Sequence, residues 1–168
     1  YHAYEFVHTL KVEEIFDMKF DVICCNPPYQ LSTGGGTEEK KSATQAKPIY
    51  HKFIEQAKKM RPRYITMIIP ARWYNGGMGL NQFRADMLND KSLTRLVDFN
   101  NSKDCFQGVD IAGGVCYFLW DRDHPTERRT ITNITGDGTN TTERALSEYG
   151  TFFVRANDSI PIIQKVQS

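Results

Sequence analysis

The chain has 168 residues, of which 24% are charged and 40% are hydrophobic, and its formal net charge is +1. This length suits one domain with a core of reasonable size. The near balance of charge argues against a strongly basic nucleic-acid module, although a local basic patch is compatible with it. No signal peptide and no membrane-spanning run is visible. The four cysteines form no C-x-x-C pair, so we expect reduced thiols, no metal site and a cytoplasmic protein.

The first half of the chain alternates between predicted strands and helices. Residues 21–25 form an apolar run that predicts a strand buried on both faces. Residues 30–47 are polar and rich in glycine, which predicts a mobile loop. Pro48 suits the first turn of a helix that ends at Arg61-Pro62. A second buried strand is expected at residues 64–69, where Pro70 stops it.

The middle of the chain predicts a short helix and two paired strands. A glycine-rich loop precedes the expected helix at residues 80–88. Residues 96–99 and 115–120 have the composition of strands, and the link at 100–114 has no helical period, so the pair is predicted to be antiparallel. The expected fold class is α/β: part of a doubly wound, Rossmann-like sheet whose last two strands form a hairpin at its edge.

The composition changes to Thr, Asn, Gly and charged residues after His124-Pro125. We therefore predict a domain boundary near residue 124, with one unit at residues 1–124 and the start of a second region at 125–168. A strand is expected at 129–135, a turn follows it, and a further strand is possible at 152–154. The chain starts at Tyr1, shortly before a strand, so we expect a piece of a longer protein.

The tetrapeptide Asn26-Pro27-Pro28-Tyr29 ends the first predicted strand. Two prolines give a stiff, extended exit that is rich in carbonyl acceptors. The Asn side chain adds another acceptor, and the Tyr ring adds a flat stacking surface. Such a corner can hold a planar amino group, which needs two acceptors and a face. The structural alternative is a tight turn after a buried strand.

This pattern resembles the amino-directed DNA methyltransferases, in particular the adenine-N6 enzymes of restriction–modification systems. The tetrapeptide carries most of the resemblance, and three further stretches support it over roughly residues 15–122: 47–53, 69–74 and 104–111. The resemblance implies methyl transfer from S-adenosylmethionine to the amino group of an adenine flipped out of double-stranded DNA. Because no glycine-containing turn follows an earlier strand, most of the cofactor site is expected upstream, and this fragment alone is expected to be inactive.

The resemblance also assigns roles to residues. Asn26 and Pro27 would accept the two amino hydrogens, Pro28 would stiffen the turn, and Tyr29 would stack on the base. Phe106 is the candidate for the opposite side of the stack, or it caps the core. The remaining candidates lie in the most basic segment of the chain, whose composition favours a solvated face over phosphate contacts. The candidate phosphate contacts are Lys40, Lys41 and Lys47.

Other functions remain open at this stage. Protein-glutamine methyltransferases also use Asn-Pro-Pro-Tyr to orient a planar amide, and methylation of an RNA base is a similar alternative. A DNA-binding specificity module that retains an old pocket is the non-enzymatic alternative. In the methyltransferase hypothesis the partners are duplex DNA and a fused or separate restriction endonuclease, with no membrane.

Overall fold

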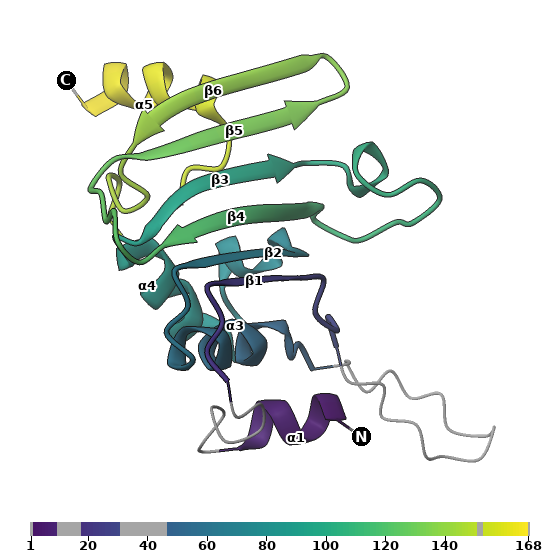
Figure 1. Cartoon of the computed structure of the whole chain (residues 1–168). Coiled ribbons are helices and arrows are strands. Elements are labelled where there is room, and N and C mark those ends of the chain that lie inside the picture. Colours follow the sequence, from purple (N-terminus) through teal and green to yellow (C-terminus); the bar gives the residue numbers. More distant parts are fainter. Residues whose placement is uncertain (1, 10–17, 31–46, 151–152, 168) are drawn as a thin grey trace.

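The computed structural model describes residues 2–9, 18–30, 47–150 and 153–167. Within them, six strands form one sheet in the order β1-β2-β4-β3-β5-β6 (Figure 1). The pair β1–β2 is parallel, β4 is antiparallel to both β2 and β3, and β5 is parallel to β3 and antiparallel to β6. The strands are Val22–Cys25 (β1), Tyr64–Pro70 (β2), Leu93–Phe99 (β3), Val115–Asp121 (β4), Arg129–Thr135 (β5) and Gly138–Arg144 (β6).

This topology confirms the α/β class and the antiparallel pairing of β3 with β4. The expected position of that pair at the sheet edge is wrong, because β5 hydrogen-bonds to the other side of β3. The alternating sequence of β5 gives this strand one buried face, and its backbone hydrogen-bonds to the edge of β3 that β4 leaves open. The boundary predicted near residue 124 therefore lies within one continuous sheet, and the separate role of residues 125–168 stays a prediction.

The expectation that β1 is buried on both faces is also wrong. Val22 is 54% exposed and Cys24 is exposed, whereas Ile23 and Cys25 pack toward the core. The reason is that β1 forms the edge of the sheet and, in the described part of the chain, helices cover only one of its faces. The strand therefore alternates between core and solvent, as a one-sided sheet requires.

Helix α3 (Tyr50–Lys59) packs on the covered face of the sheet through its apolar stripe, with Ile54 and Ala57 fully buried. It starts two residues after Pro48, because Pro48 forms an isolated bridge with Gln30 and the Ile49 amide donates to the Tyr29 carbonyl at 3.1 Å. The predicted mobile loop, with Lys40 and Lys41, lies almost entirely outside the described residues.

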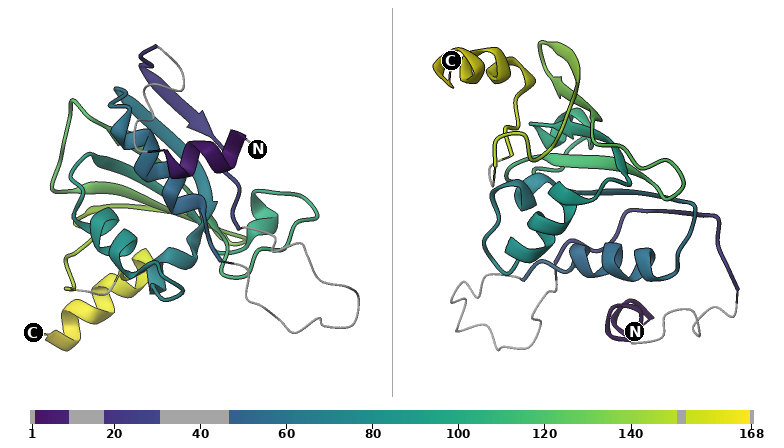
Figure 2. Two further views of the ribbon diagram at one scale, coloured as in Figure 1. Left: turned by 90° about the horizontal axis from the view of Figure 1, so that it is seen from below. Right: turned by 90° about the vertical axis from the view of Figure 1, so that its left-hand side faces the viewer.

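Helix α1 (His2–His8) lies on the side of α3 that faces away from the sheet (Figures 1 and 2). Phe6 stacks on Phe53 with ring centroids 5.5 Å apart. The buried Gln56 side chain donates to the carbonyls of Phe6 and Thr9 at 2.9 and 2.8 Å. None of the helices in the described part of the chain has the length and apolar character needed to span a bilayer.

The second half of the core forms around helix α4 (Asn81–Asn89), whose Phe83, Met87 and Leu88 face inward as predicted. Short 3-10 helices follow β2 (η1, Ala71–Asn75) and β3 (η2, Ser102–Asp104). A third one, η3 (Asn157–Ser159), leads into the last helix, α5 (Ile160–Gln167).

The segment after β6 docks on the sheet through polar contacts rather than as the strand suggested at 152–154. Residues 153 and 154 have no regular structure, and residue 152 lies outside the described residues. The Arg155 guanidinium forks onto the fully buried Asp98 carboxylate at 2.7 and 2.9 Å. The Asn157 amide donates to the Asn133 side chain at 2.8 Å. These bonds hold Phe153 against Tyr74, with centroids 4.6 Å apart.

Candidate functional site

The carboxyl ends of the parallel strands β1 and β2 meet at one edge of the sheet, and both chains leave there through proline-containing corners. The corner after β1 contains the tetrapeptide. Asn26 and Pro28 are exposed, Pro27 is buried and Tyr29 is half-buried. The corner is therefore accessible from solvent, as binding of a base requires.

The acceptors of this corner are free in the described part of the chain. No hydrogen bond of normal geometry there engages the Asn26 side chain or the Pro27 carbonyl. Asn26, Pro27 and Pro28 border a wide hollow of about 410 Å³ that extends to Tyr29 and Gln30. Two oxygen acceptors thus lie at an open surface beside an aromatic ring.

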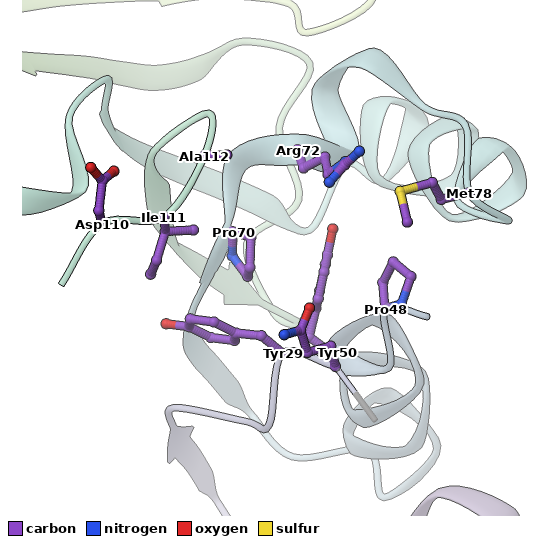
Figure 3. A pocket seen from close by; sticks show the side chains of 10 residues that line it. Tyr29, Pro48, Tyr50, Pro70, Arg72, Met78, Asp110, Ile111 and Ala112 are labelled. Carbon is purple, nitrogen blue, oxygen red and sulfur yellow. The ribbon is translucent and has the colours of Figure 1, made fainter. Parts of the chain in front are cut away.

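A second hollow, also bordered by Tyr29, has a volume of about 270 Å³ (Figure 3). Five segments form it: the corner after β1, the start of α3, the corner after β2, the loop before α4 with Met78, and the loop before β4. Figure 3 shows the Tyr50 phenol extending across this cavity toward Arg72, with Pro70 and Ile111 on the wall near the Tyr29 ring. Tyr29 and Gln30 border both hollows.

Both phenols at this cavity are buried at their oxygen, and neither hydroxyl makes a hydrogen bond of normal geometry with a described residue. Burial raises the pKa of Tyr29 to about 12; the thiols of Cys105 and Cys116 add to this shift, and the side chain of Asn26 opposes it. Burial also raises the pKa of Tyr50 well above its ordinary value. The Trp73 backbone amide lies near the Tyr50 oxygen and opposes the rise in the pKa of Tyr50. Both rings are therefore neutral at physiological pH, and both hydroxyls are available as donors.

The loop before β4 is fixed by backbone contacts. The Ser102 hydroxyl donates to the Val109 carbonyl at 2.9 Å and accepts from the Ile111 amide at 2.8 Å. Gly114 closes the loop at φ +79°, and its carbonyl accepts a hydrogen bond from Ala71 at 3.0 Å. A Cβ at Gly114 would lie 2.1 Å from the Phe99 carbonyl oxygen, so glycine permits this close approach.

The other residues predicted for the site lie at different places. Phe106 is half-buried in the loop before β4 and does not border the 270 Å³ cavity, so its stacking role stays a prediction. Lys47 is exposed just before the cavity wall at Pro48. Lys40 and Lys41 lie outside the described residues.

The two aromatics after β2, Trp73 and Tyr74, pack in the core. Trp73 is fully buried, and its Nε1 lies 3.5 Å from the Cys116 sulfur. Tyr74 is 4% exposed and contacts Trp73 edge to face.

Tyr50 and Arg72 are cavity residues that the sequence interpretation did not single out. Both belong to stretches that carry the family resemblance, 47–53 and 69–74. The helical period drew attention to Ile49 and Phe53 instead. The available signal was a Tyr at the first helical residue, directly after a proline-containing turn.

Comparisons with known proteins agree with this geometry. Residues 1–106 match the model of the Eco57I restriction-modification methylase family. A Mycoplasma pneumoniae protein described as an "uncharacterized adenine-specific methylase" is 35% identical over 148 residues, which covers 83% of this chain and 34% of that protein. The chain thus spans about a third of the length of this relative.

Two solved structures share the fold at low identity. One is a chain of a type I restriction–modification system, with a TM-score of 0.50 and 17% identity over 92% of this chain and 30% of that chain. The other is the type IIG restriction endonuclease BpuSI, with a TM-score of 0.51 and 13% identity over 76% of this chain and 19% of that chain. These likenesses support the fold alone, whereas the family match covers more than half of the chain. The chain belongs to the Eco57I restriction-modification methylase family.

Proposed function

We propose that this chain carries the base-holding part of a DNA methyltransferase that modifies the N6 amino group of adenine. The observation that supports this most directly is the corner after β1. The Asn26 oxygen and the Pro27 carbonyl accept no hydrogen bond of normal geometry from the described residues, and they lie at an open surface beside the Tyr29 ring. The name of the Mycoplasma relative, an adenine-specific methylase, favours the same substrate.

The chemistry asked of this corner is positioning and electrostatic stabilisation. The amino nitrogen of adenine is conjugated with its ring and is a poor nucleophile. The Asn26 oxygen and the Pro27 carbonyl would accept its two hydrogens, which fixes the nitrogen and favours the positive charge that builds up on it. Pro28 keeps the backbone extended, so the acceptors need no rearrangement on binding.

The Tyr29 ring would support the base. An adenine within a duplex cannot reach this hollow, so the nucleotide must be extruded, at a cost of a few kcal/mol. Stacking on an aromatic side chain offsets roughly 1–3 kcal/mol per base. Phe106 remains our candidate for the opposite ring, because its loop lies close enough for the neighbouring Cys105 to influence the Tyr29 phenol.

S-adenosylmethionine is the methyl donor that we infer from the family resemblance. Duplex DNA is the proposed partner, with a restriction endonuclease that is fused or separate and a cytoplasmic setting.

A methylation assay on the full-length protein tests the proposal. Labelled S-adenosylmethionine is incubated with duplex DNA, RNA and a glutamine-containing protein, and the methylated products are separated. We expect N6-methyladenine in DNA, and a turnover reduced at least 100-fold in Asn26→Ala. The matched control is Asn89→Ala, an exposed asparagine on α4, which should retain turnover. Methylglutamine or methylated RNA as the only product would refute the DNA substrate.

The stacking role has its own matched variants. Tyr29→Phe retains the ring and should retain most of the turnover, whereas Tyr29→Ala should lose most of it. Tyr117→Ala removes an equally large ring that is 40% exposed on the uncovered face of the sheet. Equal activity of Tyr29→Ala and Tyr117→Ala would contradict the role of Tyr29.

A further inference from the structure

The cavity between Tyr50 and Arg72 contains a polar group that the base-holding role of the tetrapeptide does not use. Tyr50 is only 2% exposed, yet its hydroxyl proton has no acceptor among the described residues, because the nearby Trp73 backbone amide can only donate to the oxygen. Native structures rarely leave a buried hydroxyl unpaired, so such a group indicates a missing ligand or water. Its oxygen points into the cavity toward the Arg72 side chain (Figure 3).

Arg72 supplies positive charge at the same cavity. It lies on the first turn after β2 and is exposed, and no ion pair in the described part of the chain involves it. Its guanidinium opposes the rise in the pKa of Tyr50, so the two groups interact. The carboxylate at the cavity, that of Asp110, lies 3.3 Å from the Lys103 ammonium, which offsets its charge.

We propose that this cavity binds a backbone phosphate that flanks the flipped nucleotide, with the Arg72 guanidinium and the Tyr50 hydroxyl as its donors. The inference rests on the proposed function, because it places the base on Tyr29. A guanidinium fork and a hydroxyl are all donors, and they match the acceptor oxygens of a phosphodiester. Exposed Lys47, next to the wall residue Pro48, adds to the positive character of the rim.

The position of the cavity favours a phosphate over a second base contact. Asn26, Pro27 and Pro28 do not border it, whereas Tyr29 and Gln30 border both it and the hollow beside the tetrapeptide. A nucleotide whose base lies in that hollow carries its sugar and phosphates outward from the ring. Holding a flanking phosphate would stabilise the extruded backbone, which stacking alone does not fix.

The first experiment measures DNA binding by the full-length protein. Fluorescence anisotropy with a fluorescein-labelled duplex that contains the methylated sequence is recorded from 50 to 300 mM NaCl. Arg72→Gln should weaken binding about tenfold at 100 mM NaCl and reduce the slope of log K against log salt by about 0.9, which corresponds to one phosphate contact. Tyr50→Phe should weaken binding about threefold with an unchanged slope. The control is Arg95→Gln, an exposed arginine on β3 that does not border the cavity.

The second experiment removes the phosphate charge itself. Duplexes with an uncharged methylphosphonate at one of the two positions flanking the target adenine are compared with the normal duplex. The wild type should lose about tenfold in affinity at one position, whereas Arg72→Gln should lose none there. Equal losses in both proteins at both positions would overturn the proposal.

Stability of the free protein tests the unpaired hydroxyl directly. If the hydroxyl has no partner, Tyr50→Phe should unfold at the same or a higher temperature than the wild type, because the ring keeps its packing. A clear decrease would show that the hydroxyl is already paired and would overturn the inference. If the proposed function is wrong and DNA is not a substrate, the wild type and every variant fail to methylate DNA. If only the phosphate site is wrong, Arg72→Gln binds and methylates DNA like the wild type.

Discussion

Replacing Gly114 with alanine should damage both stability and the site, and the neighbouring glycine offers a matched control. Gly114 and Gly113 adopt left-handed conformations, with φ of +79° and +87°. A Cβ at Gly114 would meet two backbone oxygens, those of Phe99 at 2.1 Å and Asn100 at 2.7 Å. A Cβ at Gly113 would meet nothing within 4 Å. Both substitutions therefore place alanine in a left-handed backbone conformation, but only Gly114→Ala also brings a Cβ into collision with backbone oxygens.

The magnitudes follow from these distances. A left-handed conformation costs an L-residue roughly 1–2 kcal/mol, which both variants incur. The collision at Gly114 is with carbonyl groups that end β3, which cannot rotate away as a side chain can, so it adds about 1–3 kcal/mol. We expect Gly114→Ala to be less stable than Gly113→Ala by about 1–3 kcal/mol, or roughly 2–12 °C in melting temperature.

The assay is urea unfolding followed by tryptophan fluorescence, with turnover measured in parallel. Turnover should fall more in Gly114→Ala, because the Gly114 carbonyl accepts the hydrogen bond of Ala71, which precedes the cavity residue Arg72. Equal destabilisation by the two substitutions would show that the loop before β4 relaxes freely. The reasoning about a fixed close approach would then be refuted.

Two further predictions concern ionisable groups. Arg155→Met should lower the free energy of unfolding by about 3 kcal/mol, because it leaves the buried Asp98 carboxylate unpaired. Adding Asp98→Asn should recover part of this loss, as measured by urea unfolding. Strictly additive losses of the two substitutions would argue against a coupled pair. The neutral Tyr29 phenol makes its full contribution to stability below its ordinary pKa of 10.0. This contribution is lost as the pH rises through the pKa of about 12 that Tyr29 has in the folded protein. Melting temperatures should therefore fall less steeply between pH 10 and 12 in Tyr29→Phe, and identical slopes would contradict the raised pKa.

Local sequence patterns were sufficient for the elements and for the key corner. Apolar runs located β1 and β2, and the absence of a helical period at residues 100–114 correctly predicted that β3 and β4 are antiparallel. The rigid tetrapeptide could be located because its chemistry depends on adjacent residues. A proline pair fixes the backbone whatever surrounds it.

The features that sequence analysis missed depend on contacts between distant residues. The pairing of β5 with β3 and the Asp98–Arg155 ion pair join segments across intervening strands, and no local period encodes such partners. Tyr50 was overlooked for a related reason. A large aromatic side chain at the start of a helix looks like a core residue, and only the structure shows that its hydroxyl is buried without an acceptor among the described residues.

The contact between the two prolyl segments would fix the proposed base and phosphate sites relative to each other. Gln30 pairs with Pro48 in a single antiparallel bridge, and the Ile49 amide donates to the Tyr29 carbonyl. Tyr29 and Tyr50 therefore lie on two strands of chain that are tied together beside the sheet, so their separation is fixed by backbone hydrogen bonds rather than by flexible side chains. A nucleotide that reaches both rings meets a preorganised surface, and the cost of ordering the site is met during folding rather than during binding.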